Sequence, residues 1–156
     1  MPKHVIIDIK ECVPLLMVAD RYDHIDILRF SDRLPFAQVC RYLTNNSLTP
    51  YLTGSAVTLA LQGRAGHYDD IDILAVGRQE SVFGVVQRLE QLSKQCVKKN
   101  VTLEEEGSLF TVTSEKKLRY LHAEMNARYT LQPVRRATHA IDLSLIVDSA
   151  FEKLVR

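Results

Sequence analysis

The sequence lacks the features that define several large classes of protein. It has three cysteines, an odd number, and no CxxC pair, which argues against a disulfide framework or a cysteine-based zinc site. The apolar run at residues 13–19 is too short to span a bilayer, and residues 1–8 lack the long apolar core of a signal peptide. We therefore expect a cytoplasmic protein that makes no membrane contact.

An excess of one charge sign is also missing. The formal net charge is +1 at pH 7, so charge alone does not indicate nucleic acid as a partner, and there is no polybasic patch for a membrane surface. Hydrophobic residues make up 46% and charged residues 25% of the 156 residues, as in an ordinary globular protein. No repeat, low-complexity segment or linker divides the chain. We expect a single domain over residues 1–156 that buries roughly 70% of its unfolded surface.

Helix-like and strand-like segments alternate along the chain. This order predicts an α/β (α+β) fold, a small mixed β-sheet with helices packed against it. Strands are expected at residues 4–9, 49–53, 70–76, 101–105, 109–113, 127–132 and 138–147. Helices are expected from Pro14 towards Phe30, from a cap at Asp32 to the turn at residues 45–47, and at residues 56–64, 80–98 and 149–156. Residues 116–128 fit a helix and a strand about equally.

Two acids at the start of one predicted strand carry the clearest chemical signal. Alternate residues of a strand point to the same face, so Asp70 and Asp72 project together, about 7 Å apart along the strand, while Ile71 and Ile73 face the core. Two carboxylates this close repel each other unless a cation lies between them. Hard oxygen ligands suit Mg²⁺ or Mn²⁺, which predicts a metal site here.

A glycine and a serine precede this strand, between a short extended segment and a helix. Gly54 lets the backbone approach a phosphate closely, and Ser55 offers a hydroxyl and a cap at the helix N-terminus. Taken alone, Gly-Ser before a helix is usually a turn and a cap, and Asp-x-Asp is usually a solvated strand end. The two features in this order favour a site for a metal and a phosphate.

The segment that contains both features resembles a known family. Leu-Thr-Gly-Ser-Ala-Val at residues 52–57, followed by Asp-Ile-Asp-Ile at residues 70–73, resembles the signature of the nucleotidyltransferase superfamily related to DNA polymerase β. Within that superfamily, residues 52–76 are most similar to the small minimal nucleotidyltransferases. The matched segment is about a sixth of the 156 residues. The distance from Ser55 to Asp70 is long for the family, which indicates an insertion at residues 63–69.

The resemblance implies a third carboxylate on a later strand beside the first two. Asp142 lies in the apolar segment Ala-Ile-Asp-Leu-Ser-Leu, where an acid without partners would be costly. Glu124, in His-Ala-Glu-Met, is the alternative. We favour Asp142, because Glu124 is more simply explained as a solvent-facing helix residue.

The resemblance also implies a function. Asp70, Asp72 and Asp142 would hold Mg²⁺ (or Mn²⁺), Gly54 and Ser55 would bind the triphosphate, and a nucleoside monophosphate would pass from an NTP such as ATP to an acceptor hydroxyl. A protein side chain, a tRNA end and a small molecule all remain open as acceptors; the minimal nucleotidyltransferases favour a protein, such as a toxin partner encoded nearby. Because the chain ends soon after the third acidic strand, a partner or a homodimer is expected to supply the acceptor-binding surface. The alternative is an inactive module that binds nucleotide or a protein.

Overall fold

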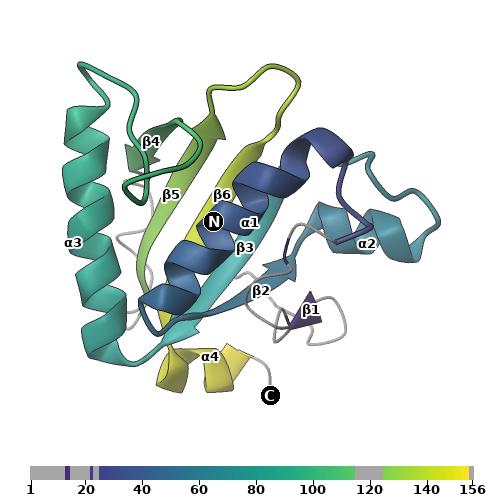
Figure 1. Ribbon diagram of the computed structural model, residues 1–156. Coiled ribbons are helices and arrows are strands. Elements are labelled where there is room, and N and C mark those ends of the chain that lie inside the picture. Colours follow the sequence, from purple (N-terminus) through teal and green to yellow (C-terminus); the bar gives the residue numbers. More distant parts are fainter. Residues whose placement is uncertain (1–12, 15–21, 23–24, 115–124, 155–156) are drawn as a thin grey trace, which may run out of the picture.

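The computed structural model describes residues 13–14, 22, 25–114 and 125–154, and it contains a six-stranded mixed sheet with helices packed against it (Figure 1). The mixed α/β fold expected from the sequence is thus confirmed. The strands are β1 (Val13–Pro14), β2 (Thr49–Thr53), β3 (Asp70–Gly77), β4 (Phe110–Ser114), β5 (Met125–Pro133) and β6 (Ala140–Val147). The helices are α1 (Phe30–Asn45), α2 (Ser55–Leu61), α3 (Gln79–Gln95) and α4 (Asp148–Leu154).

The order of strands across the sheet is β1-β2-β3-β6-β5-β4. The central strands β3 and β6 are parallel, and the other pairs are antiparallel. Parallel strands need a crossover connection, which here contains α3, β4 and β5. The crossover brings two segments that are distant in the sequence into direct register, with Asp72 opposite Asp142.

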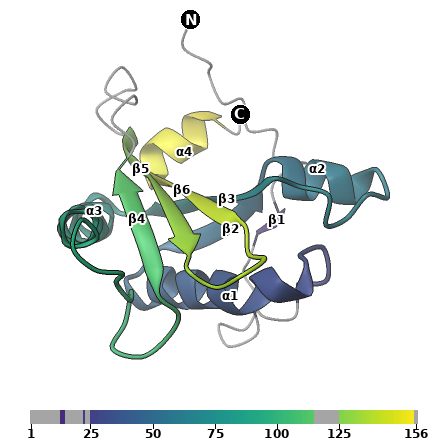
Figure 2. The same cartoon turned by 90° about the horizontal axis from the view of Figure 1, so that it is seen from above.

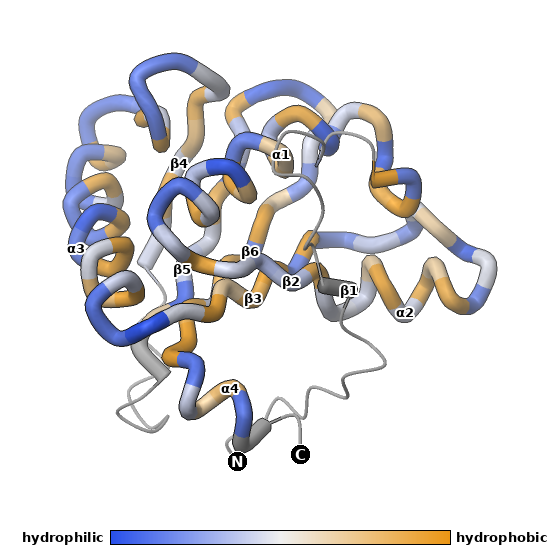
Figure 3. Tube along the Cα trace, turned by 60° about the horizontal axis from the view of Figure 1, so that its bottom comes forward, coloured by the Kyte–Doolittle hydropathy of each residue, from blue (hydrophilic) through white to orange (hydrophobic). Residues whose placement is uncertain are grey.

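The two faces of the sheet differ in what covers them. Figure 2 shows α1 and α4 on opposite sides of the sheet. The main core lies under α1 and α3 and contains the alternate residues Ile71, Ile73, Ile141 and Leu143. The central strands are accordingly orange, the hydrophobic colour, along much of their length in Figure 3.

The opposite face is apolar only in its second half. There Ala150 of α4 packs on a small cluster of the strand residues Leu74, Val76 and Ile146. These strand residues lie on the same face of the sheet as Asp72 and Asp142, because each is an even number of residues away from the aspartate of its own strand. The first half of this face therefore presents polar side chains, while the second half is covered by α4.

Helix α1 follows the apolar periodicity of its sequence. Phe36, Val39, Cys40 and Leu43 are all fully buried on one face, as the spacing predicts. The helix ends at Asn45, and Ser47 then takes a positive φ of 63°, so the predicted turn is confirmed. The cap is different from the prediction: Arg29, not Asp32, is the N-cap residue.

Some of the expected helices and strands are different in the structure or lie outside the residues that it describes. Pro14 does not open a helix: it lies in the edge strand β1, opposite Tyr51, a position where a residue without an N–H is tolerated. Residues 101–105 form no full strand, only an isolated bridge between Val101 and Phe110, and the chain bends at residues 103–107. The expected strand at residues 4–9 lies outside the described residues.

In the part of the chain that is described, no helix is long and apolar enough to cross a membrane.

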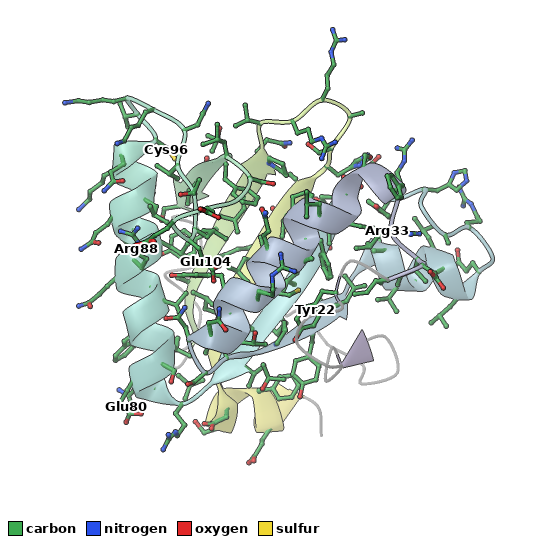
Figure 4. All side chains as sticks on the ribbon, viewed as in Figure 1. Tyr22, Arg33, Glu80, Arg88, Cys96 and Glu104 are labelled. Atoms are coloured by element: carbon green, nitrogen blue, oxygen red, sulfur yellow. The ribbon has the colours of Figure 1, made fainter. Side chains whose placement is uncertain are left out.

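The two cysteines in the described residues are free thiols. Cys40 is buried in α1, and Cys96 follows the end of α3 next to β4 (Figure 4). The Cys96 sulfur accepts a hydrogen bond from the backbone N–H of Val112 at 3.2 Å. Cys40 belongs to the main core and Cys96 packs against it, as small apolar residues do.

Candidate metal centre

Three carboxylates meet at the start of the two central strands. Asp70 and Asp72 share one face of β3, and Asp142 lies opposite Asp72 on the parallel strand β6. One ligand oxygen from each of the three residues lies within 4.8 Å of the others. The proximity predicted for Asp142 is confirmed, whereas its rival Glu124 lies outside the described residues.

Asp70 and Asp72 both have a raised pKa, first because of burial and then because of the neighbouring acids. Burial raises the pKa of Asp70 from its ordinary value of 3.8 to about 6, and the hydrogen bond to Asp142 and the charge of Asp72 act in the same direction. Burial also raises the pKa of Asp72, with the charge of Asp142 as the second cause. A cation between the three groups would relieve this repulsion.

Strand β5 supplies two further polar contacts. Thr130 and Arg128 lie opposite Asp142 and Ser144 of β6, so they share the acidic face. The Thr130 hydroxyl donates to Asp142 Oδ1 at 3.0 Å. The Arg128 guanidinium nitrogen Nη2 lies 3.6 Å from Asp142 Oδ2 and 3.7 Å from Asp72 Oδ1.

The donor set suits a hard divalent cation. It consists of carboxylate oxygens from two strands, and the Asp72 and Asp142 side chains are 27% and 14% exposed. Mg²⁺ binds oxygens at about 2.1 Å, so two ligands on one ion lie at most about 4.2 Å apart. Small side-chain rotations from the present spacing would reach that geometry. The three aspartates could therefore hold Mg²⁺ or Mn²⁺, with water or phosphate as the remaining ligands.

Gly54 lies beside Asp72, where any larger residue would clash. The sequence did not reveal this steric requirement for glycine. Its φ is 74°, and a Cβ at this position would overlap the Asp72 carboxylate, lying 2.9 Å from Cγ. The preceding residue, Thr53, pairs with Asp72 across β2 and β3. Glycine at this position thus permits close approach of the backbone to a candidate metal ligand.

Ser55 is the first residue of α2 rather than its cap. Gly54 occupies the N-cap position, and no side-chain hydrogen bond caps the helix, so the capping role predicted for Ser55 is wrong. The helix also ends at Leu61, three residues before the expected end, and Gly63 follows with a φ of 74°. Ser55 remains at the beginning of a helix whose first N–H groups have no partner within the helix.

Asp32 forms a buried network under the start of the acidic strands. It is only 1% exposed. Its carboxylate accepts hydrogen bonds from the Tyr68 hydroxyl at 2.6 Å and from the backbone N–H of His139 at 2.8 Å, and Nδ1 of His139 lies 2.9 Å away. Tyr68 and His139 lie just before β3 and β6, so Asp32 ties α1 to the beginnings of the strands that carry the three acids.

Arg128, Thr130 and the partners of Asp32 were not found by reasoning from the sequence. For β5 a weak signal exists: Arg128 and Thr130 alternate with Tyr129 and Leu131, both of which are buried. That alternation defines a polar face but not which strand it joins, so it could not connect Arg128 to the acids.

No protein-family model matches the chain, and neither a curated protein nor a solved structure matches it.

Proposed function

We propose that this protein is a metal-dependent nucleotidyltransferase that transfers a nucleoside monophosphate from an NTP, such as ATP, to an acceptor hydroxyl. One observation carries the proposal. Asp70, Asp72 and Asp142 meet on one face of two parallel strands, with their ligand oxygens within 4.8 Å, beside the Gly54 turn. Clustered oxygen ligands and a closely approaching backbone suit a Mg²⁺-bound triphosphate.

In the proposed reaction, the acceptor oxygen attacks the α-phosphorus of the NTP. A bond forms between that oxygen and phosphorus, the bond from phosphorus to the α–β bridging oxygen breaks, and pyrophosphate leaves with the bonding electrons. When bound, Mg²⁺ would neutralise phosphate charge at the reacting centre. Asp142 orients the acceptor hydroxyl and accepts its proton, as a carboxylate base can. Backbone N–H groups at Gly54 and Ser55 contact the triphosphate.

A second function, nucleotide binding without transfer, is favoured by the position of Arg128. A guanidinium beside two of the three acids already supplies a positive charge, which an inactive binding module could retain permanently. Two measurements separate the candidates. A thermal shift with ATP, with and without Mg²⁺, reports binding, and pyrophosphate release reports transfer. An enzyme gives both, while a binding module gives only the first.

The matched variants for this test are Asp142→Asn and Asp148→Asn. Each removes one carboxylate charge, but Asp148 is exposed at the start of α4 and, among the described residues, is not part of a group that could hold a metal ion. Pyrophosphate release should fall by at least about a hundredfold in Asp142→Asn, in line with the loss of a general base, and stay unchanged in Asp148→Asn. Equal activity of wild type and Asp142→Asn would contradict the proposal.

The acceptor we propose is a hydroxyl on a protein partner, such as a toxin encoded nearby, in line with the resemblance to minimal nucleotidyltransferases. Labelled ATP tests this directly: the α-phosphate label should move to the protein product of a neighbouring gene and remain after denaturation. A homodimer that completes the acceptor surface is tested by light scattering in the same buffer. Transfer of the label to RNA or to a small molecule instead would move the proposal to that acceptor class.

A further inference from the structure

Arg128 approaches the candidate metal centre from a neighbouring strand. It lies on β5 opposite Ser144, and its guanidinium reaches across the face of the sheet to β6 and β3. Among the residues that the structure describes, it is the one whose cationic group forms ion pairs with the clustered acids. A single nitrogen, Nη2, approaches both Asp72 and Asp142.

The distances between the Arg128 guanidinium and the two carboxylates are those of ion pairs rather than of fixed hydrogen bonds. At 3.6 and 3.7 Å, both N···O separations exceed the usual 2.7–2.9 Å or so of a charge-assisted hydrogen bond. The Arg128 side chain is also 35% exposed, so water can reach the guanidinium. By contrast, Thr130 holds Asp142 with a hydrogen bond of 3.0 Å. Arg128 can therefore move away from the acids at small cost, whereas Asp142 stays in place.

A divalent cation and the guanidinium compete for the same carboxylates. Asp72 and Asp142 are two of the three ligands in the candidate metal centre, and both are the partners of Arg128. A metal ion bound to them would repel a positive charge at this distance. A guanidinium released from carboxylates matches phosphate well, because its planar donors bind two oxygens at once.

We propose that Arg128 is an internal counter-ion that a metal ion displaces from Asp72 and Asp142, and that the released guanidinium then binds the phosphates of the nucleotide. The second half rests on the function proposed above. Arg128 therefore has two opposite effects. Its side chain weakens the binding of metal alone and strengthens the binding of metal together with nucleotide. A residue with only a structural role would not produce this pair of effects.

The experiment titrates Mn²⁺ by calorimetry, first alone and then with an ATP analogue that has a methylene group in place of the α–β bridging oxygen. Arg128→Gln should bind Mn²⁺ alone more tightly, on the order of fivefold, because the repulsive charge is gone. It should bind the Mn²⁺-analogue complex at least about tenfold more weakly, because a charged hydrogen bond to phosphate is lost.

Two further variants complete the design. Arg88→Gln removes the same charge from α3, the helix that covers the other face of the sheet, and should change neither affinity (Figure 4). Arg128→Lys keeps the positive charge but loses the planar fork, so it should bind Mn²⁺ like wild type and the analogue more weakly. Thermal melts of all variants verify that they are folded.

The outcomes separate the inference from the proposed function. Weaker or unchanged Mn²⁺ binding by Arg128→Gln overturns the counter-ion role. Tighter Mn²⁺ binding with unchanged analogue affinity overturns the phosphate role alone. If wild type binds Mn²⁺ but not the analogue, the proposed function fails and the phosphate role fails with it, while the Mn²⁺ comparison still decides the counter-ion role.

Discussion

Replacing Asp70 by asparagine should stabilise the metal-free protein while it abolishes activity. In the wild type, ionised Asp70 carries its negative charge in a partly buried position. This burial is the main reason why its pKa is raised, and the hydrogen bond to Asp142 and the charge of Asp72 act in the same direction. Asparagine removes that charge at nearly constant shape, and its amide can donate a hydrogen bond to Asp142. Functional residues often reduce stability in this way, so gain of stability and loss of function should occur together.

The expected size follows from the pKa. A rise from 3.8 to about 6 corresponds to about 3 kcal/mol if the full shift counted as lost stability. Asp70 is partly exposed, and solvent screening reduces such interactions, so we expect about 1 kcal/mol at neutral pH. For a domain of this size that is an increase in Tm of about 2–4 °C.

The effect should depend on pH in one direction. Because the pKa is raised on folding, native Asp70 keeps its proton between about pH 4 and pH 6, where the unfolded chain has released it. Wild-type stability therefore falls as pH rises through that window. The Tm advantage of Asp70→Asn should be full at pH 7.5 and small at pH 4.5.

The assay is thermal unfolding followed by circular dichroism in EDTA, at both pH values. Asp69→Asn is the matched control: it removes an exposed carboxylate one residue earlier and should change the free energy of unfolding by less than about 0.5 kcal/mol. An unchanged or lower Tm for Asp70→Asn at pH 7.5 would refute the reasoning and indicate that the acids have a structural role.

Three further predictions concern neighbouring residues. Calorimetry should show a divalent-cation site that strengthens with NTP and is strongly weakened in Asp72→Asn; equal binding by both proteins would mean that the site is assigned wrongly. Gly54→Ala should destabilise the fold by about 1–3 kcal/mol in urea unfolding, because its Cβ overlaps Asp72 at a positive φ, and should cost more than Gly63→Ala, where φ is also 74° but no atom lies within 4 Å. Asp32→Ala should cost about 3 kcal/mol, since it leaves buried donors unpaired; a loss under about 0.5 kcal/mol in the same assay would show that the network is dispensable.

The elements that the sequence predicted well are those with a local, repeating signal. The strand at residues 49–53 has the predicted bounds, and the strand predicted at residues 70–76 extends by one residue to Gly77. The shared face of Asp70 and Asp72 follows from strand periodicity alone. Asp142 was expected because the family resemblance implied a third carboxylate on a later strand, and its apolar neighbours favoured it over Glu124. The strand bounds and the shared face use only neighbours along the chain.

The contacts that were missed are those that depend on how distant segments pair. Asp32 looks like a helix cap in the sequence, yet its partners Tyr68 and His139 lie 36 and 107 residues away. A polar residue in the first turn of a helix has several ways to satisfy its oxygens, and the choice depends on what the fold places beside it. Tertiary contact therefore overrode the local preference for capping.

The net charge of the site also depends on how distant segments pair, so it could not be predicted from the sequence. From the sequence, three carboxylates would leave a local charge of −3. The register of β5 against β6 places Arg128 beside two of them, which reduces the local charge to −2 when all the groups are ionised. While Arg128 lies beside the acids, its charge weakens their attraction for a metal ion, and once the guanidinium binds phosphate instead, the full charge of the three carboxylates acts on the cation. Whether Arg128 stays or leaves thus decides how strongly the acids attract metal, and the strand register that sets this balance is a property of the fold.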